Sequence, residues 1–134
     1  MLIGVTSKGG IKIDLATGAG VTAEIERLRS ASVLDIPRLV SNEYRLYPLV
    51  DQIADKVCAT ADSYNGRPSS REKDLVDLVV IAVTQDVDGS ALGVAIATET
   101  KRRKMVHIDN FVVPSSWGAP YAKLARRVPH CAGF

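Results

Sequence analysis

Apolar residues recur at helical spacing through the middle of the chain, and this pattern constrains the fold more than any other feature. Directly after Pro48, which suits the first turn of a helix, come Leu49, Ile53 and Val57 at intervals of four residues. A second apolar stripe follows and comprises Leu75, Leu78, Val79 and Ala82. Because the turn-forming stretch 65–68 separates the two stripes, the sequence predicts two consecutive helices.

The second of these helices has a predicted start signal. Ser69 and Glu72 have the spacing of a capping box, in which each residue's side chain bonds a backbone N–H of the other. Val76, Val80 and Ile81 widen the apolar stripe, so we expect this helix to be buried on most sides.

Two more helices are predicted towards the C-terminus. One begins near Ser90 and ends before the basic run 101–104. The other covers residues 117–128, where apolar side chains again recur at helical spacing. The connecting residues 107–116 predict a loop, and within it residues 110–113 also fit a short strand.

The first 47 residues predict short extended segments. Residues 2–5 and 11–15 predict two strands of a hairpin, joined by the glycine-containing turn 6–10. Residues 21–29 fit either a short helix or a charged loop, whereas the stretches 31–36 and 44–47 each fit a strand. The prediction is therefore an α+β chain, with a region of small strands in residues 1–47 and a helical region in residues 48–134.

Composition excludes several classes of protein. Of the 134 residues, 46% are hydrophobic and 24% charged, which is too apolar for a disordered chain. Cys58 and Cys131 match neither a metal motif nor a disulfide framework. Since the sequence has neither a run long enough to span a membrane nor a secretory signal, we expect a soluble cytoplasmic domain.

Charge is distributed unevenly along the chain. Residues 1–100 carry 10 basic and 14 acidic side chains, whereas residues 101–134 carry seven basic side chains and Asp109. Clustered cations attract polyanions such as RNA, but Lys and Arg also favour the solvated last turn of a helix. Both interpretations stay open for the weak RNA-binding candidates Arg102, Arg103, Arg126 and Arg127.

Two aspartates interrupt the start of the apolar second helix. Asp74 and Asp77 are three residues apart and therefore lie on one face of that helix. Favourable placement near a helix N-terminus explains Asp74 well and Asp77 less well, because Asp77 falls where the helix requires burial. A carboxylate in that position needs a cationic partner, and Arg71, Lys73 or Lys56 can supply it.

Lys56 and Asp14 are the other candidate residues. Lys56 lies beside the apolar stripe of the first helix, where a lysine either extends to solvent or serves as a fixed cation for a phosphate. Asp14 belongs to the predicted strand 11–15, and it fits a solvent-facing position about as well as a functional one.

Residues 44–82 carry a family resemblance. Lys56 lies in the string Tyr-Arg-Leu-Tyr-Pro-Leu-Val-Asp-Gln-Ile-Ala-Asp-Lys-Val-Cys-Ala, and Asp74 and Asp77 lie in Gly-Arg-Pro-Ser-Ser-Arg-Glu-Lys-Asp-Leu-Val-Asp-Leu-Val. With these two linked motifs, the chain resembles the AbiEii/AbiGii nucleotidyltransferase toxins of type IV toxin–antitoxin systems. The similarity extends less specifically back to Asp14 and forward through residues 92–103.

The resemblance implies a fold, a reaction and a set of partners. It implies a remnant β-hairpin of a DNA polymerase β-like nucleotidyltransferase sheet, followed by a mainly helical C-terminal region. Such enzymes transfer a nucleotide from a nucleoside triphosphate to an acceptor, which in some members is transfer RNA. The implied cofactor is Mg²⁺, and the implied protein partner is a cognate antitoxin.

The resemblance also assigns roles to residues. Lys56 matches the lysine that holds the triphosphate, and either Asp74 or Asp77 matches the essential aspartate, so the resemblance makes these three the catalytic candidates. Arg71 and Lys73 fall where substrate phosphates are contacted. Asp14, in the hydrophobic-flanked strand 11–15, matches a carboxylate of the metal site.

The chain departs from the family pattern in one respect. The family's Gly-Ser motif is followed by paired metal-binding acids, but here Gly89-Ser90 has none after it, and Asp86-Val-Asp88 precedes it. We therefore expect a truncated member whose missing motif is encoded upstream, with little transferase activity in the 134-residue chain alone. The alternatives are a non-catalytic RNA- or protein-binding helical module, and a helical interaction protein in which Asp14, Lys56 and Asp74 are structural.

Overall fold

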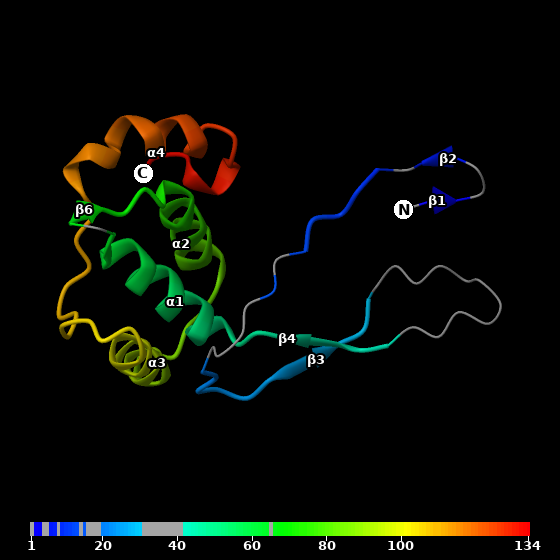
Figure 1. Cartoon of the computed structure of the whole chain (residues 1–134), viewed down its shortest axis with the longest axis horizontal. Helices are drawn as coiled ribbons and strands as arrows, with labels where there is room; N and C mark the ends of the chain where they lie inside the picture. The colour runs from blue at the N-terminus through cyan, green and yellow to red at the C-terminus, as the bar shows by residue number, and fades with distance from the viewer. Residues whose placement is uncertain are drawn as a thin grey trace.

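The computed structural model describes residues 2–3, 6–7, 9–13, 15, 20–30, 42–64 and 66–134. Figure 1 shows a body of helices from which a β-hairpin and the N-terminal segment extend to one side. The helices are α1 (Leu49–Ala61), α2 (Glu72–Thr84), α3 (Gly89–Arg102) and α4 (Gly118–Ala125), with 3₁₀ turns at Ser115–Trp117 and Pro129–Cys131. Together with the strands, they confirm the predicted α+β class.

The strands of the described residues form three antiparallel pairs. β1 (Leu2–Ile3) pairs with β2 (Thr6–Ser7), β3 (Glu26–Leu28) with β4 (Tyr44–Leu46), and β5 (Ser63–Tyr64) with β6 (Arg67–Pro68). The predicted pairing of residues 2–5 with 11–15 is wrong. Strand β1 pairs instead with residues 6–7, which were expected to form the turn, and the shorter loop costs less entropy to close.

Residues 21–29 do not form the helix that was one of the two expectations, and the expected loop holds only for residues 21–25 and 29. Their second half is strand β3, whose three residues align with β4 in the register Glu26 to Leu46, Arg27 to Arg45 and Leu28 to Tyr44. A cross-strand partner that is distant in sequence thus determines their conformation, while the expected strand at 44–47 is confirmed as β4. The strand expected at 31–36 lies outside the described residues.

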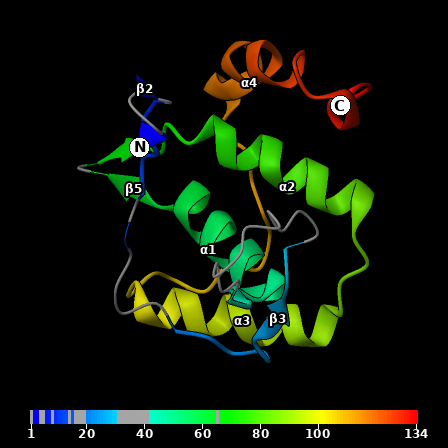
Figure 2. The same ribbon diagram turned by 90° about the vertical axis from the view of Figure 1, so that its right-hand side faces the viewer.

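Helix α1 lies between α2 and α3 and forms the centre of the body (Figure 2). Its buried face includes Ile53, Ala54, Val57 and Cys58, so the apolar stripe seen in the sequence faces inward. The helix begins one residue later than predicted, because Pro48 precedes it and contributes only its carbonyl, which accepts the N–H of Gln52 at 3.0 Å.

The start of α2 differs from the predicted capping box. The helix begins at Glu72, and no side chain caps it. Ser69 is buried instead, and its carbonyl accepts a 2.9 Å hydrogen bond from the Trp117 indole N–H. Among the described residues its hydroxyl has no partner, so Ser69 is held by its backbone and does not cap the helix.

Helix α2 is less buried than predicted. Val76 is its only buried residue, and it packs with Ala125 and Cys131 in a small core to which α4 and the second 3₁₀ turn contribute. The rest of its apolar surface is half-exposed, because α1 and α4 cover only part of the helix.

The last two helices agree more closely with the sequence. Helix α3 begins at Gly89, where the Asp88 carboxylate accepts the backbone N–H of Ala91 at 2.8 Å. Asp88 therefore caps a helix, which accounts for one acid of the Asp86-Val-Asp88 string. Helix α4 is shorter than the predicted 117–128, and residues 107–114 form the predicted loop without a strand at 110–113.

None of the helices among the described residues combines the length and apolar character that crossing a membrane requires.

Candidate functional site

A charged cluster joins helices α1 and α2. The Lys56 ammonium of α1 donates to Asp74 Oδ1 at 3.1 Å and to Asp77 Oδ2 at 2.8 Å, both on α2. The three-residue spacing of the aspartates turns both carboxylates towards α1, as expected for one helix face. The structure therefore brings together the three residues that the sequence singled out as catalytic candidates.

Two further cations border this cluster. Arg71 Nη1 lies 3.5 Å from Asp74 Oδ2, and Lys73 Nζ lies 3.8 Å from Asp77 Oδ2. Both flanking side chains are exposed, and that of Lys73 is 83% accessible. All five charged candidates between residues 56 and 77 thus belong to one site, which carries one net positive charge.

Lys56 is held in its charged form. Partial burial acts to lower the pKa of its ammonium, but the hydrogen bonds to Asp77 and Asp74 outweigh burial, so this pKa lies above the ordinary value for lysine. The side chain is nevertheless 22% exposed. The Lys56 cluster, meaning Lys56, Asp74, Asp77, Arg71 and Lys73, therefore combines an oriented cation with access from solvent.

The donor geometry of Lys56 leaves room for a ligand. An ammonium has three N–H donors, and within the described part of the chain Asp74 and Asp77 accept two of them. The third donor, with the exposed groups of Arg71 and Lys73, is suited to an anionic oxygen such as that of a phosphate.

The same geometry does not fit a metal ion. Both aspartates direct an oxygen at the Lys56 ammonium, which fills the position between them. No group of three or more His, Cys, Asp or Glu residues suited to a metal occurs within the described ranges. Asp14, the predicted metal ligand, lies outside them.

A second charged cluster joins α1 to the end of α3. Glu99 is buried and accepts hydrogen bonds from Arg102 Nε at 2.7 Å and from Arg103 Nε at 2.5 Å. Arg103 also donates to Asp55 Oδ1 at 2.5 Å. The hydrogen bonds from Arg102 lower the pKa of Glu99 despite burial, with Arg103 contributing in the same direction.

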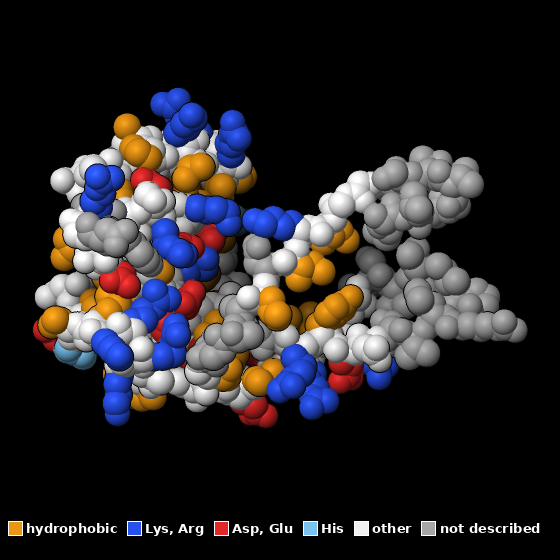
Figure 3. Space-filling model, viewed as in Figure 1, with side chains coloured by type: hydrophobic (Ala, Val, Ile, Leu, Met, Phe, Trp, Pro, Cys, Tyr) orange, Lys and Arg blue, Asp and Glu red, His pale blue; other side chains and the backbone are white. Residues whose placement is uncertain are grey.

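This second cluster gives a structural role to two of the four weak RNA-binding candidates. Arg102 and Arg103 are paired with Glu99 and Asp55, and these four residues, the Glu99 cluster, have no net charge. Arg126 and Arg127 are exposed at the end of α4, as is Lys123. In Figure 3, Lys and Arg side chains project from the upper part of the body, where α4 lies.

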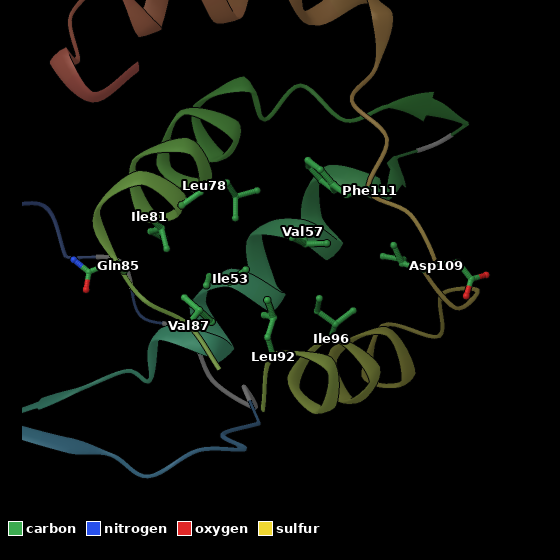
Figure 4. A pocket seen from close by; sticks show the side chains of 12 residues that line it. Ile53, Val57, Leu78, Ile81, Gln85, Val87, Leu92, Ile96, Asp109 and Phe111 are labelled. Carbon is green, nitrogen blue, oxygen red and sulfur yellow. The ribbon is translucent and has the colours of Figure 1, made fainter. Parts of the chain in front are cut away.

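An apolar hollow of about 490 Å³ lies between α1, α2 and α3 (Figure 4). The side chains that converge on it are mainly aliphatic and include Ile53, Val57, Leu78, Ile81, Leu92 and Ile96. Its polar lining residues are Gln85 and Asp109. The hollow therefore lacks the cations that a phosphate requires, and the Lys56 cluster is the better candidate for an anionic ligand.

Sequence reasoning missed one polar contact at the base of α1. Asp51 is 3% exposed and accepts the backbone N–H of Thr22 at 3.0 Å, the Thr22 hydroxyl at 2.6 Å and the Ala23 N–H at 3.3 Å. These bonds fasten residues 20–30 to the helix that bears Lys56. The only available signal was an acid in the first turn of a helix, which normally interacts with its own helix.

Taken together, the fold and the Lys56 cluster define an α+β protein with a cationic site between two helices. Residues 2–130 match the family described as nucleotidyl transferase AbiEii toxin, type IV toxin–antitoxin system. Because this match covers most of the chain, the protein belongs to the AbiEii family, as the resemblance of residues 44–82 indicated. Neither the curated proteins nor the solved structures include a match to the chain.

Proposed function

We propose that the chain binds the triphosphate of a nucleoside triphosphate at the Lys56 cluster, as part of a nucleotidyltransferase reaction with an RNA acceptor. The observation that carries this proposal is the ammonium of Lys56, fixed between Asp74 and Asp77 yet accessible to solvent. Family membership supports the reaction type, since the matched family is one of nucleotidyl transferase toxins.

Each residue of the cluster has a role in this proposal. Lys56 supplies a point charge to the triphosphate through its third N–H donor. Arg71 and Lys73 add charge from the rim, where both are exposed. Asp74 and Asp77 act by holding the ammonium charged and oriented, which makes both of them positioning residues and leaves neither as the single essential aspartate.

Nucleotidyl transfer in general uses divalent metal ions, and Mg²⁺ is the proposed cofactor. Such ions stabilise the charge that develops when a hydroxyl attacks the α-phosphorus. The described residues do not fit a metal ion, because Lys56 occupies the space between Asp74 and Asp77. We therefore assign no step of the reaction to a metal held by these two residues.

The proposed acceptor is transfer RNA or another RNA, and the proposed location is the cytoplasm. A type IV toxin–antitoxin system also implies a cognate antitoxin as partner. Exposed cations, Arg126 and Arg127 among them, support an RNA acceptor by raising the local concentration of polyanions.

Nucleotide binding tests the proposal directly. The full chain is titrated with each of the four nucleoside triphosphates in the presence of Mg²⁺, by calorimetry. Lys56→Gln is expected to weaken binding by at least tenfold, whereas Lys123→Gln, which removes an exposed lysine from α4, is expected to leave it unchanged. Equal affinities for the two variants, or no binding by the unmodified chain, would contradict the proposal.

Transfer is measured separately with labelled triphosphate and transfer RNA. Label transferred by the unmodified chain and abolished by Lys56→Gln would extend the proposal from binding to catalysis. Binding without transfer would favour the second candidate function, a non-catalytic RNA-binding module. The absence of paired acids after Gly89-Ser90 is the observation that favours this second candidate.

A further inference from the structure

The β3–β4 hairpin places two arginines directly opposite one another. In its register Arg27 of β3 is the cross-strand partner of Arg45 of β4, so their Cα atoms are about 5 Å apart and both side chains lie on one face. Both are exposed, and neither forms an ion pair with any residue that the structure describes. Like charges in this arrangement destabilise a strand pair.

Among the described residues, few other contacts of the β3–β4 hairpin offset this repulsion. Figure 1 shows β3 and β4 running side by side away from the helices, and within the described ranges this sheet consists of two strands. A two-stranded sheet is marginally stable in water even without an unfavourable pair. Unfavourable local arrangements such as this pair of opposed arginines are expected at functional sites, where a bound ligand supplies the interaction that the protein lacks.

The face of the hairpin that carries Arg27 and Arg45 is positively charged, and the opposite face is not. Extending the register by one pair on the same face gives Arg29 opposite Glu43, which form a 3.3 Å ion pair. Three arginines and one glutamate leave two positive charges. On the opposite face Glu26 and Leu46 alternate with Leu28 and Tyr44, so the hairpin has one basic and one mainly apolar face.

We propose that the basic face of the β3–β4 hairpin, consisting of Arg27, Arg29 and Arg45, binds the phosphates of the RNA acceptor. The proposal rests on the proposed function in taking RNA as the ligand. Guanidinium groups are well suited to phosphate because they present parallel N–H donors to two oxygens. A phosphodiester anion between Arg27 and Arg45 converts their mutual repulsion into two attractive contacts.

Transfer RNA is the probe for the decisive experiment. Its affinity for the full chain is measured at several salt concentrations for Arg45→Glu and for Arg67→Glu, a charge-matched reversal of an exposed arginine on β6, outside α4 and the Lys56 cluster. Arg45→Glu is expected to weaken binding about tenfold at low salt and to reduce the slope of log affinity against log salt by about 1. A loss no greater than that of Arg67→Glu would overturn the proposal.

The same substitution is expected to stabilise the hairpin, and this separates the binding role from a structural one. Arg45→Glu places an acid opposite Arg27, so amide hydrogen exchange at residues 26–28 and 44–46 slows while RNA binding weakens. Arg27→Gln relieves the repulsion without adding an acid and is expected to weaken RNA binding to a smaller extent. RNA affinity that follows hairpin stability, rather than the number of arginines, would refute the proposal.

Further controls distinguish RNA binding by the hairpin from triphosphate binding at the Lys56 cluster and from membrane binding. RNA binding needs no nucleotide, so the result is independent of whether Lys56→Gln alters triphosphate binding. Conversely, Arg45→Glu is expected to leave triphosphate affinity unchanged, because Arg45 is not part of the Lys56 cluster. Arginine-dependent binding to vesicles of anionic phospholipid, with no binding to RNA, would overturn the proposal in favour of a membrane surface.

Discussion

Two charged clusters meet helix α1 through consecutive residues, and they differ in how completely their charges are matched. Asp55 belongs to the Glu99 cluster, in which two carboxylates and two guanidinium groups cancel. Lys56 belongs to the cluster with α2, in which three cations face two carboxylates. The first cluster fastens α3 to α1, whereas the second retains positive charge and exposed donors.

The comparison shows that residue type alone does not distinguish a structural ion pair from a binding site. Both clusters consist of Asp or Glu with Lys or Arg, and each joins α1 to another helix. What differs is burial and charge balance. Glu99 has its charge matched by Arg102 and Arg103, whereas described residues accept only two of the three N–H donors of Lys56, which lies beside two exposed cations.

The largest expected effect on stability comes from removing the buried carboxylate of the Glu99 cluster. Glu99→Gln is expected to lower the free energy of unfolding by about 3 kcal/mol, because it leaves Arg103 half-buried with a single charged partner. Urea denaturation measures the change. The control Glu43→Gln, which removes an exposed ion pair with Arg29, is expected to cost less than about 1 kcal/mol. Equal losses would show that the Glu99 cluster carries no special stability.

Cys58, on the buried face of α1, provides a second test, which concerns how stability depends on pH. Burial raises the pKa of its thiol to about 11 from an ordinary value of 9.0. The folded chain holds the thiol proton more tightly than the unfolded chain does. The contribution of this group to the free energy of unfolding is therefore complete below pH 9 and is lost as the pH rises towards 11. The expected loss is about 2–3 kcal/mol.

Denaturation at several pH values, compared between the natural chain and Cys58→Ala, isolates this contribution from that of other groups. The natural chain is expected to lose more stability between pH 9 and 11 than the variant does. Parallel curves for the two proteins would contradict the assignment.

The smallest changes in stability are expected at the Lys56 cluster. Lys56→Gln is expected to cost about 1 kcal/mol, because Arg71 and Lys73 still face the two aspartates. Lys73→Gln is expected to cost less than about 0.5 kcal/mol, since this side chain is mainly in solvent. Thermal unfolding measures both. A loss at Lys56 as large as that of Glu99→Gln would remove the contrast between the clusters and indicate a structural role for both.

Helix positions were predictable wherever an apolar stripe and a break signal occurred together. The pattern of Leu49, Ile53 and Val57 identified α1, and residues 65–68 marked the connection after it. The Lys56 cluster was predictable for a related reason, because two aspartates on one apolar face require a cation nearby. The choice of Lys56 over other cations also needed the family resemblance.

The strands and the caps were less predictable. Strand β3 forms because Tyr44–Leu46 lies alongside it, and no local signal in residues 21–29 specifies that partner. The capping box did not form, since Ser69 is buried and its carbonyl is bonded to the indole N–H of Trp117, which is distant in sequence. In both cases a long-range contact outweighs a local preference.

By itself, the sequence determined where helices form, where they end and that two acids lie in an apolar segment. These features depend on residues within a few helical turns of one another. Only the tertiary structure decided which charges are matched. Arg102 and Arg103 resemble a free basic run in sequence, but packing of α3 against α1 brings them to Glu99 and Asp55. Arg27 and Arg45 are 18 positions apart and become neighbours only through the strand register, because cross-strand pairing is set by contacts that the chain order does not reveal.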